Sequence, residues 1–390
     1  MERIYLDHAA TTPLDPAVFD AMAPYLREQF GNASSVHQLG RQARVAVEDA
    51  RHRIAAALNA EPSEIVFTSG GTESDNLALK GALQARAADG RTRLVTSAAE
   101  HEAVLRPAER RHDAGAPVTI LRPDAHGAVS PARVENALDD QTALVSLMHA
   151  NNETGVLTDV PAIAAVCHAH NVWLHCDAVQ TAGLLDLDVK ALDVDLLSLS
   201  GHKMYGPKGI GALYVRGGID LPPLVEGGSQ ERRRRGGTEN VAAIAGFAEA
   251  LTQAAASAAE RQAHLAALQK RVVSGLDDAI DGPYICTTPL HDAPVAPHIV
   301  NVAFPPVDGV PLDGEMLILN LDMQGVLVSA GSACTSGALE PSHVLSALGL
   351  ARETASAAVR VSMGKATTAA DVDRFLEALH DTVRRMRPSS

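Results

Sequence analysis

Val172-Trp-Leu-His-Cys-Asp177, an apolar run with strand character, and the similar run from Asp193 to Ser200 decide the fold. More such runs alternate with helical segments along the first half of the chain. Strands are expected at 65–68, 94–97, 118–121, 142–148 and 211–215, and helices at 72–88 and 161–170. This alternation indicates an α/β domain with a mainly parallel sheet covered by helices on both faces. Ligands of such sheets bind beyond the carboxyl ends of the strands, where Asp177 and Ser200 both fall.

The second part of the chain has a different pattern. Residues 240–276 are rich in alanine and predict a long helix that leaves the first domain. Short strands expected at 298–304, 326–329 and 358–363 then mix with helices, which indicates a smaller α+β domain. Because 390 residues exceed what one core normally supports, we expect a large domain over 14–255 and a small one formed by 1–13 and 256–390. The first dozen residues pack with the small domain or cross the junction.

Composition excludes several classes of protein. The net charge of −14 argues against direct nucleic-acid binding and against binding to an anionic membrane surface. No apolar stretch approaches the roughly 20 residues of a membrane helix, and the N-terminus lacks the apolar region of a signal peptide. A cytoplasmic protein is therefore expected. The cysteines lack CxxC spacing, so no resident metal is expected, and three of them fit core positions: Cys167, Cys176 and Cys286.

Lys203 ends the run Leu199-Ser-Gly-His-Lys203. A buried lysine is costly unless it has a partner or a chemical role. Together with Asp177 at another strand end, it suggests pyridoxal phosphate (PLP), with the lysine forming the Schiff base and the aspartate holding the pyridinium nitrogen protonated. Taken singly, Lys203 could be a surface lysine and Asp177 could cap the next helix. The joint occurrence at strand ends favours the cofactor.

The turn Thr68-Ser-Gly-Gly-Thr-Glu-Ser-Asp75 joins an expected strand to an expected helix. Glycines let the backbone approach an anion, and the amides of a helix N-terminus bind phosphate. Gly71 and Thr72 are therefore candidate phosphate ligands, as are Ser200 and His202. The alternative is an ordinary turn with a capping box that begins at Thr72.

Three further polar residues follow expected strands. His101 could stack on the cofactor ring and shuttle protons, and Gln180 could reach the ring hydroxyl. Asn152, in His149-Ala-Asn-Asn-Glu-Thr-Gly155, is expected to hydrogen-bond the ring hydroxyl or the substrate. Each also fits an incidental polar position.

Cys334 lies in Ser329-Ala-Gly-Ser-Ala-Cys-Thr-Ser-Gly-Ala338, a segment otherwise made of Gly, Ala, Ser and Thr. This composition leaves little to bury and predicts a mobile loop, which suits a nucleophile that moves between two places. An incidental loop cysteine is the alternative. Arg360 has the geometry to clamp a substrate carboxylate, or it forms a structural ion pair.

Together these motifs, with Leu6-Asp-His-Ala-Ala-Thr-Thr-Pro13 and Gly331-Ser-Ala-Cys-Thr-Ser336, resemble the cysteine desulfurases of the class V aminotransferases. The resemblance spans nearly the whole chain and implies a PLP enzyme of fold type I, in the branch that serves iron–sulfur cluster assembly and tRNA thiolation. It implies that Cys334 attacks the sulfur of L-cysteine and becomes a persulfide while alanine is released. Cys334 could then touch an iron–sulfur cluster transiently.

The resemblance also implies the role of each site residue. Lys203 holds the cofactor and later acts as acid and base, Asp177 pairs with the ring nitrogen, and His101 stacks on the ring. Asn152 and Gln180 contact the ring oxygen, and Asn152 and Arg360 position the substrate carboxylate. The implied phosphate ligands are Gly71, Thr72, Ser200, His202 and, from a partner subunit, Thr238. Thr238 therefore implies a homodimer, and a sulfur-acceptor protein such as an iron–sulfur scaffold or a thiolation enzyme is the further partner.

One segment departs from the family pattern. Ser229 and Arg233 stand where glycines are expected in Gly227-Gly-Ser-Gln-Glu-Arg-Arg-Arg-Arg-Gly-Gly-Thr238. The arginines 232–235 form either a docking patch for an acidic acceptor or tRNA, or a solvated surface loop.

Two alternative functions remain: a different enzyme of the class V family, or a protein without catalytic activity. A selenocysteine lyase, an epimerase or an aminotransferase would share Lys203 and Asp177 without all needing a mobile cysteine. A non-catalytic relative that serves as a binding partner would bind no PLP.

Overall fold

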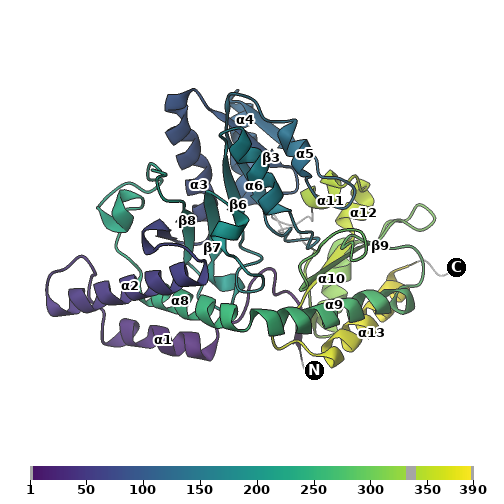
Figure 1. Ribbon diagram of the computed structural model, residues 1–390. Helices are drawn as coiled ribbons and strands as arrows, with labels where there is room; N and C mark the ends of the chain where they lie inside the picture. Colours follow the sequence, from purple (N-terminus) through teal and green to yellow (C-terminus); the bar gives the residue numbers. More distant parts are fainter. Residues whose placement is uncertain (1–2, 331–339, 388–390) are drawn as a thin grey trace.

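The computed structural model describes residues 3–330 and 340–387 (Figure 1). Its centre is a seven-stranded sheet with the order β2-β8-β7-β6-β5-β3-β4, in which only β8 runs antiparallel to its neighbours. The strands are β2 (Ile65–Thr68), β3 (Arg93–Ser97), β4 (Val118–Leu121), β5 (Thr142–Met148), β6 (Trp173–Asp177), β7 (Leu196–Ser200) and β8 (Gly211–Val215). The expected mainly parallel α/β sheet is confirmed.

Helices cover both faces of this sheet because its central strands are apolar on both sides. Neighbouring residues of one strand belong to different cores: Leu144 packs with side chains of α3 and α4, and Val145 with side chains of α2, α6 and α8. The helices are α1 (Pro16–Arg27), α2 (Gln38–Ala57), α3 (Gly71–Arg86), α4 (Glu102–Asp113), α5 (Pro131–Glu135), α6 (Val160–Ala169), α7 (Val189–Leu192) and α8 (Val241–Ala256). Short 3₁₀ turns lie at Pro62–Glu64, Ala87–Asp89, Gly201–Lys203 and Gln230–Arg233.

The C-terminal elements form a second, smaller core, on the right of Figure 1. Its antiparallel sheet has the order β12-β10-β9, and β1 pairs in parallel with β11 beside it. Its strands are β1 (Ile4–Tyr5), β9 (Ile285–Cys286), β10 (Ile299–Ala303), β11 (Val326–Leu327) and β12 (Ala358–Ser362). Its helices are α9 (Ala258–Ala279), α10 (Gly314–Met323), α11 (His343–Ala347), α12 (Arg352–Ser356) and α13 (Ala369–Met386).

The N-terminal segment reaches both parts of the molecule. Beyond β1, Asp7 forms a bridge with Ser362 of the smaller sheet, and Thr12 donates to the carbonyl of His202 in the larger part. The N-terminal residues therefore pack with the smaller sheet at Asp7 and reach the larger part of the molecule at Thr12.

The long helix expected at 240–276 is wrong in one respect, because it is two helices. α8 and α9 meet at Ser257 with a bend of 71°. The Ser257 hydroxyl donates to the carbonyl of Gln253 and accepts from Arg261, so it competes with the backbone ladder at the bend. Within the described residues, no single helix meets the length and hydropathy of a membrane span, although this bent pair does when taken together.

The loop at 229–235 adopts left-handed backbone angles at three residues that are not glycine. Ser229 has a φ of −85°, which any residue adopts, whereas Glu231, Arg232 and Arg233 all have φ between 45° and 69°. Arg233 therefore occupies the left-handed region at a cost that glycine would avoid. Buried Glu231 holds the loop: it accepts two bonds of 2.8 Å from Arg51 and a third from the Phe67 amide.

Replacing Glu231 by alanine is expected to destabilise the protein by about 3–5 kcal/mol, because Arg51 would remain buried with its charge unpaired. Urea unfolding of the variant measures the loss. Glu48→Ala is the matched control, since Glu48 also contacts Arg51 but is 35% exposed, and about 1 kcal/mol or less is expected. Equal losses in the two variants would contradict the structural role of Glu231.

Candidate active site

Lys203 follows β7 directly and turns back toward the N-terminal segment. Its Nζ donates to the carbonyls of Ala9 and Ala10, the latter at 3.0 Å. Burial and the charge of Arg360 lower the pKa of Lys203 to about 8 from its usual 10.5, while Asp177 and Asp7 act in the opposite direction. The neutral fraction of this amine near neutral pH is therefore larger than that of an ordinary lysine, which favours a nucleophilic role.

The turn before α3 has the open geometry of an anion cradle. Gly70 caps the helix with a φ of 146° and no side-chain bond, so the alternative of a capping box beginning at Thr72 is wrong. A Cβ on Gly71 would lie 2.8 Å from Val179 Cγ2 and 3.6 Å from Ser200 Cβ, so this position requires a glycine. Gly71 and Thr72 at the start of α3 line the same cavity as Ser200, and the first amides of a helix are suited to binding phosphate.

Asp177 ends β6 and is buried. Its Oδ1 accepts from the amide of Val179, and the residues that follow form turns, so the alternative role as a helix cap is wrong. Burial raises the pKa of Asp177, while the nearby charges of His101 and Lys203 lower it. These two partners favour the ionised carboxylate that a pyridinium nitrogen would need.

His101, Asn152 and Gln180 lie around Lys203 and Asp177. His101 caps α4, with Nδ1 accepting from the Ala103 amide, and desolvation by the surrounding protein lowers its pKa. Gln180 donates to the Ala9 carbonyl at 3.0 Å. Asn152 Oδ1 is buried and has no hydrogen-bond partner among the described residues.

Two adjoining cavities connect these residues. The first has a volume of about 290 Å³ and is lined by Asp75 and by nine of the predicted site residues: Gly71, Thr72, His101, Asn152, Asp177, Gln180, Ser200, His202 and Lys203. The second, of about 350 Å³, shares His101, Asn152, Gln180 and Lys203 with the first and is also lined by Arg360. The structure therefore brings together the predicted site residues from both halves of the chain.

Two predicted residues are not part of these walls. Thr238 is exposed and does not line either cavity of its own chain. Cys334 lies outside the described residues. Arg360 lines the second cavity, and the structural ion pair considered as its alternative is also present, since it contacts Asp7 at 3.0 Å and donates to the Asn152 carbonyl.

A buried acid cluster behind Asp177 escaped the sequence analysis. Asp75 and Glu100 are each 1% exposed, and the charge of Asp177 adds to the burial that raises the pKa of both well above the usual range. His175 lies 3.6 Å from Asp75 and bonds to the hydroxyls of Ser146 and Ser198. In the sequence, the spacing of His175 and Asp177 on one strand indicated only that these two side chains share one face of the sheet.

Comparison with known proteins agrees with this site. The family model for class-V aminotransferases matches residues 4–375. A cysteine desulfurase IscS of Dictyoglomus turgidum is 42% identical, over 99% of this chain and 96% of the relative. The solved structure of a NifS-like protein superposes with a TM-score of 0.89 at 35% identity, covering 98% of this chain and all of that one. Another, of SspA in complex with cysteine, has a TM-score of 0.79 at 36% identity, covering 92% and 98%.

The chain therefore belongs to the class-V aminotransferase family. Enzymes of this family use PLP, and Asn152 Oδ1, the Gly71 turn and the partly neutral Lys203 amine all fit that cofactor. Within the family, the chain is a cysteine desulfurase of fold type I, as the matching motifs predicted.

Proposed function

We propose that this cysteine desulfurase converts L-cysteine to L-alanine and carries the removed sulfur as a persulfide on Cys334. The observation that supports this most directly is the pair of joined cavities, in which a lysine of lowered pKa and a buried aspartate face a substrate-sized space next to Arg360. The similarity to cysteine desulfurases over almost the whole chain supports the same proposal.

Nine of the cavity residues would hold the cofactor. Lys203 would bind it covalently, Asp177 would pair with the ring nitrogen, and His101 would stack on the ring. Asn152 and Gln180 hydrogen-bond the ring oxygen. The phosphate ligands are Gly71, Thr72, Ser200 and His202. When bound, PLP withdraws electrons from the Cα of an amino acid and makes its Cα–H bond labile.

Lys203 and His101 move protons in the reaction. The Lys203 amine takes the Cα proton and later returns one, which its pKa of about 8 allows. Arg360 and Asn152 orient the carboxylate of cysteine. Because Arg360 contacts Asp7 through Nη2, the substrate has to share the guanidinium with that carboxylate.

The sulfur step balances without an external oxidant. The thiolate of Cys334 attacks the substrate sulfur, so an S–S bond forms as the Cβ–S bond breaks. The electron pair of the broken bond stays with the substrate Cβ, which takes up one proton to become the methyl group of alanine. A downstream thiol can then accept the terminal sulfur from Cys334.

A homodimer completes the site in this proposal. Thr238 is exposed and lines neither of the two cavities described above, which suits a ligand for the phosphate of a partner subunit. Apolar side chains left exposed on and beside α1 and α2 also favour burial against a second copy: Phe19, Leu26, Phe30, Val36 and Val45.

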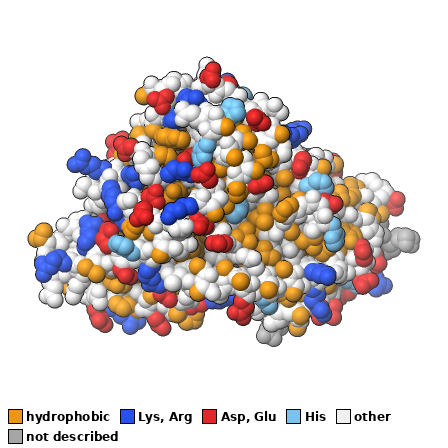
Figure 2. All heavy atoms as spheres, viewed as in Figure 1, with side chains coloured by type: hydrophobic (Ala, Val, Ile, Leu, Met, Phe, Trp, Pro, Cys, Tyr) orange, Lys and Arg blue, Asp and Glu red, His pale blue; other side chains and the backbone are white. Residues whose placement is uncertain are grey.

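We further propose the division into a large domain, 14–255, and a small domain, 1–13 and 256–390. The separate apolar core of the C-terminal elements supports it. The enzyme is proposed to be cytoplasmic and to deliver sulfur to an acceptor protein of iron–sulfur assembly or tRNA thiolation. The charge of Arg235 is paired, because Arg235 lies 3.0 Å from Glu73. Figure 2 shows acidic side chains among the basic ones on the face over α2, so this face is not uniformly basic.

A spectrum followed by product analysis tests the proposal. The purified enzyme should absorb near the visible edge and, with L-cysteine and a reductant, release alanine and sulfide in equal amounts. A strong preference for selenocysteine would instead indicate a selenocysteine lyase, and a keto acid product would indicate an aminotransferase. A protein that stays colourless with added PLP would contradict an enzymatic role.

A further inference from the structure

The chain that follows residues 331–339, the stretch that includes Cys334 and lies outside the described residues, is held by two side-chain hydrogen bonds. The Ser342 hydroxyl donates to Glu153 Oε2 at 2.5 Å, and both residues are 1% exposed. His343 Nε2 donates to the carbonyl of Glu100 at 2.8 Å. Both acceptors belong to loops that follow strands of the large sheet.

The Ser342 hydroxyl has its orientation fixed, because it also accepts from the Leu345 amide at 3.1 Å and so caps α11. Donating to Glu153 and accepting from Leu345 uses both capacities of the hydroxyl group. The contact with Glu153 is therefore directional as well as short.

Glu153 is held just as firmly on its side. Asn151 Oδ1 accepts from the amides of Glu153 and Thr154, and Asn151 Nδ2 donates to the Ala99 carbonyl. The preceding residue, Asn152, lines both cavities. Adjacent residues of one rigid loop thus serve the substrate pocket and the attachment of the segment.

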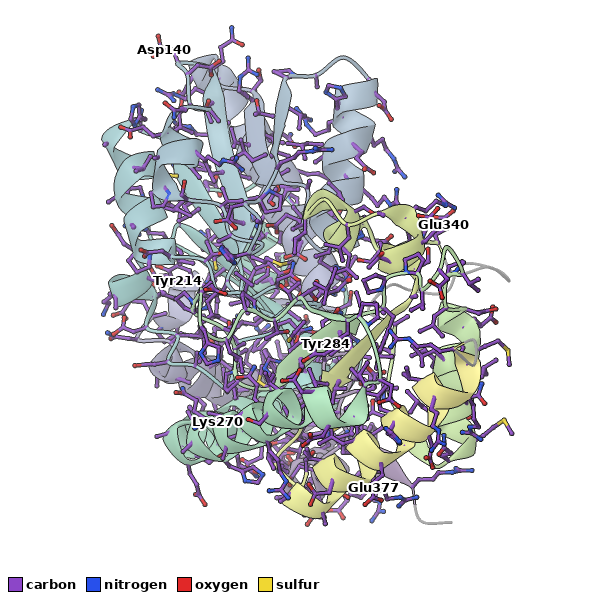
Figure 3. The ribbon with its side chains drawn as sticks, turned by 90° about the vertical axis from the view of Figure 1, so that its right-hand side faces the viewer. Asp140, Tyr214, Lys270, Tyr284, Glu340 and Glu377 are labelled. Carbon is purple, nitrogen blue, oxygen red and sulfur yellow. The ribbon has the colours of Figure 1, made fainter. Side chains whose placement is uncertain are left out.

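The chain that precedes residues 331–339 is attached to the smaller, C-terminal sheet. Ser329 exchanges two backbone hydrogen bonds with Arg360 of β12, at 2.7 and 3.3 Å. Glu340, labelled in Figure 3, lies on the other side, where the C-terminal elements meet α4, and it lines the second cavity with Glu102 and Arg106. Ser329 and His343, one from each attachment, both line this second cavity.

A carboxylate that is buried needs hydrogen bonds or charges to stay ionised. Burial raises the pKa of Glu153, whereas the Ser342 hydroxyl and the charges of His343 and Arg360 lower it. The groups that compensate for burying Glu153 are thus Ser342 and His343, which follow the Cys334 stretch, and Arg360, which lines the second cavity.

We infer that Glu153 is a positioning residue for sulfur transfer, which holds, through Ser342, the chain that follows Cys334 beside the second cavity. This inference rests on the proposed function. Glu153 touches no reacting atom, so its contribution concerns the approach of Cys334 to the substrate sulfur.

The test measures single-turnover persulfide formation on Cys334 in the holoenzyme, by alkylation and mass spectrometry. Glu153→Ala and Ser342→Asp are each expected to slow this step about tenfold, since small misplacements of reacting groups cost that much or more. PLP absorbance and the KM for cysteine should stay within about twofold of the wild type, a split that general unfolding would not produce.

Two control variants separate positioning from helix capping. Ser342→Thr keeps the hydroxyl and should react at the wild-type rate. Ser342→Asp keeps a good cap for α11 but places two carboxylates together. Combining Ser342→Asp with Glu153→Gln restores a donor and an acceptor in reversed direction, so the double variant should recover most of the lost rate.

The inference is overturned if Glu153→Ala forms persulfide at the wild-type rate, or if the double variant is as slow as Ser342→Asp. Failure of the proposed function would look different, because the wild type itself would then form no persulfide on Cys334.

Discussion

Cys334→Ser should leave PLP absorbance intact and reduce sulfide release from L-cysteine by at least about a thousandfold. The reason is that a hydroxyl cannot replace a thiolate as acceptor of sulfur, while the cofactor residues are elsewhere in the sequence. Spectra and sulfide assays under reducing conditions measure the two effects. Sulfide release at the wild-type rate by Cys334→Ser would contradict the assignment of the persulfide to Cys334.

Cys286→Ser is the matched control for this exchange. Cys286 is half-buried at the end of β9, its Sγ lies 3.4 Å from the Thr288 carbonyl, and burial raises its pKa. A thiol held in its neutral form is a poor nucleophile, so this variant should keep wild-type activity.

Lys203→Ala should lower kcat by at least about a thousandfold, because the variant loses both the covalent attachment of the cofactor and the proton carrier. The visible band of the holoenzyme should shift to that of free cofactor. Lys270→Ala, at an exposed position of α9 labelled in Figure 3, should change neither property. A lysine-independent activity of wild-type size would contradict the assignment.

The same lysine gives a pH dependence whose sign follows from its pKa. Only the neutral amine attacks an aldehyde, and it predominates above the pKa of about 8. The rate at which apoenzyme takes up PLP should therefore rise with pH through this value and then level off. Arg360→Leu removes a charge that lowers the pKa of Lys203, so its midpoint should move to higher pH. A profile with its midpoint near 10.5 would contradict the role of burial.

The sequence predicted the site better than its surroundings, for a physical reason. Parallel strands bring their carboxyl ends to one edge, so Asp177, Ser200 and Lys203 could be placed together from strand patterns alone. The burial of Glu100 and Asp75 could not be foreseen, because it depends on how α3 and α4 pack over the sheet. The ion pair of Arg360 with Asp7 joins residues 353 positions apart, beyond the reach of any local pattern.

Local rules also failed where tertiary contacts prevailed. Helical composition continues through residues 240–276, but the side-chain bonds of Ser257 and the packing of α9 against the smaller core end the first helix. At Glu231, the bonds with Arg51 hold a left-handed backbone that the residue itself disfavours.

The N-terminal segment also constrains the order of events during synthesis. β1 pairs with β11 and Asp7 forms an ion pair with Arg360, so these contacts form only after residues 326–360 have been synthesised, whereas the partner of Ala9 and Ala10, Lys203, is made earlier. The large sheet can form sooner, because its strands lie between residues 65 and 215. A nascent chain that has completed this sheet still lacks the wall of the second cavity that contains Ser329 and Arg360.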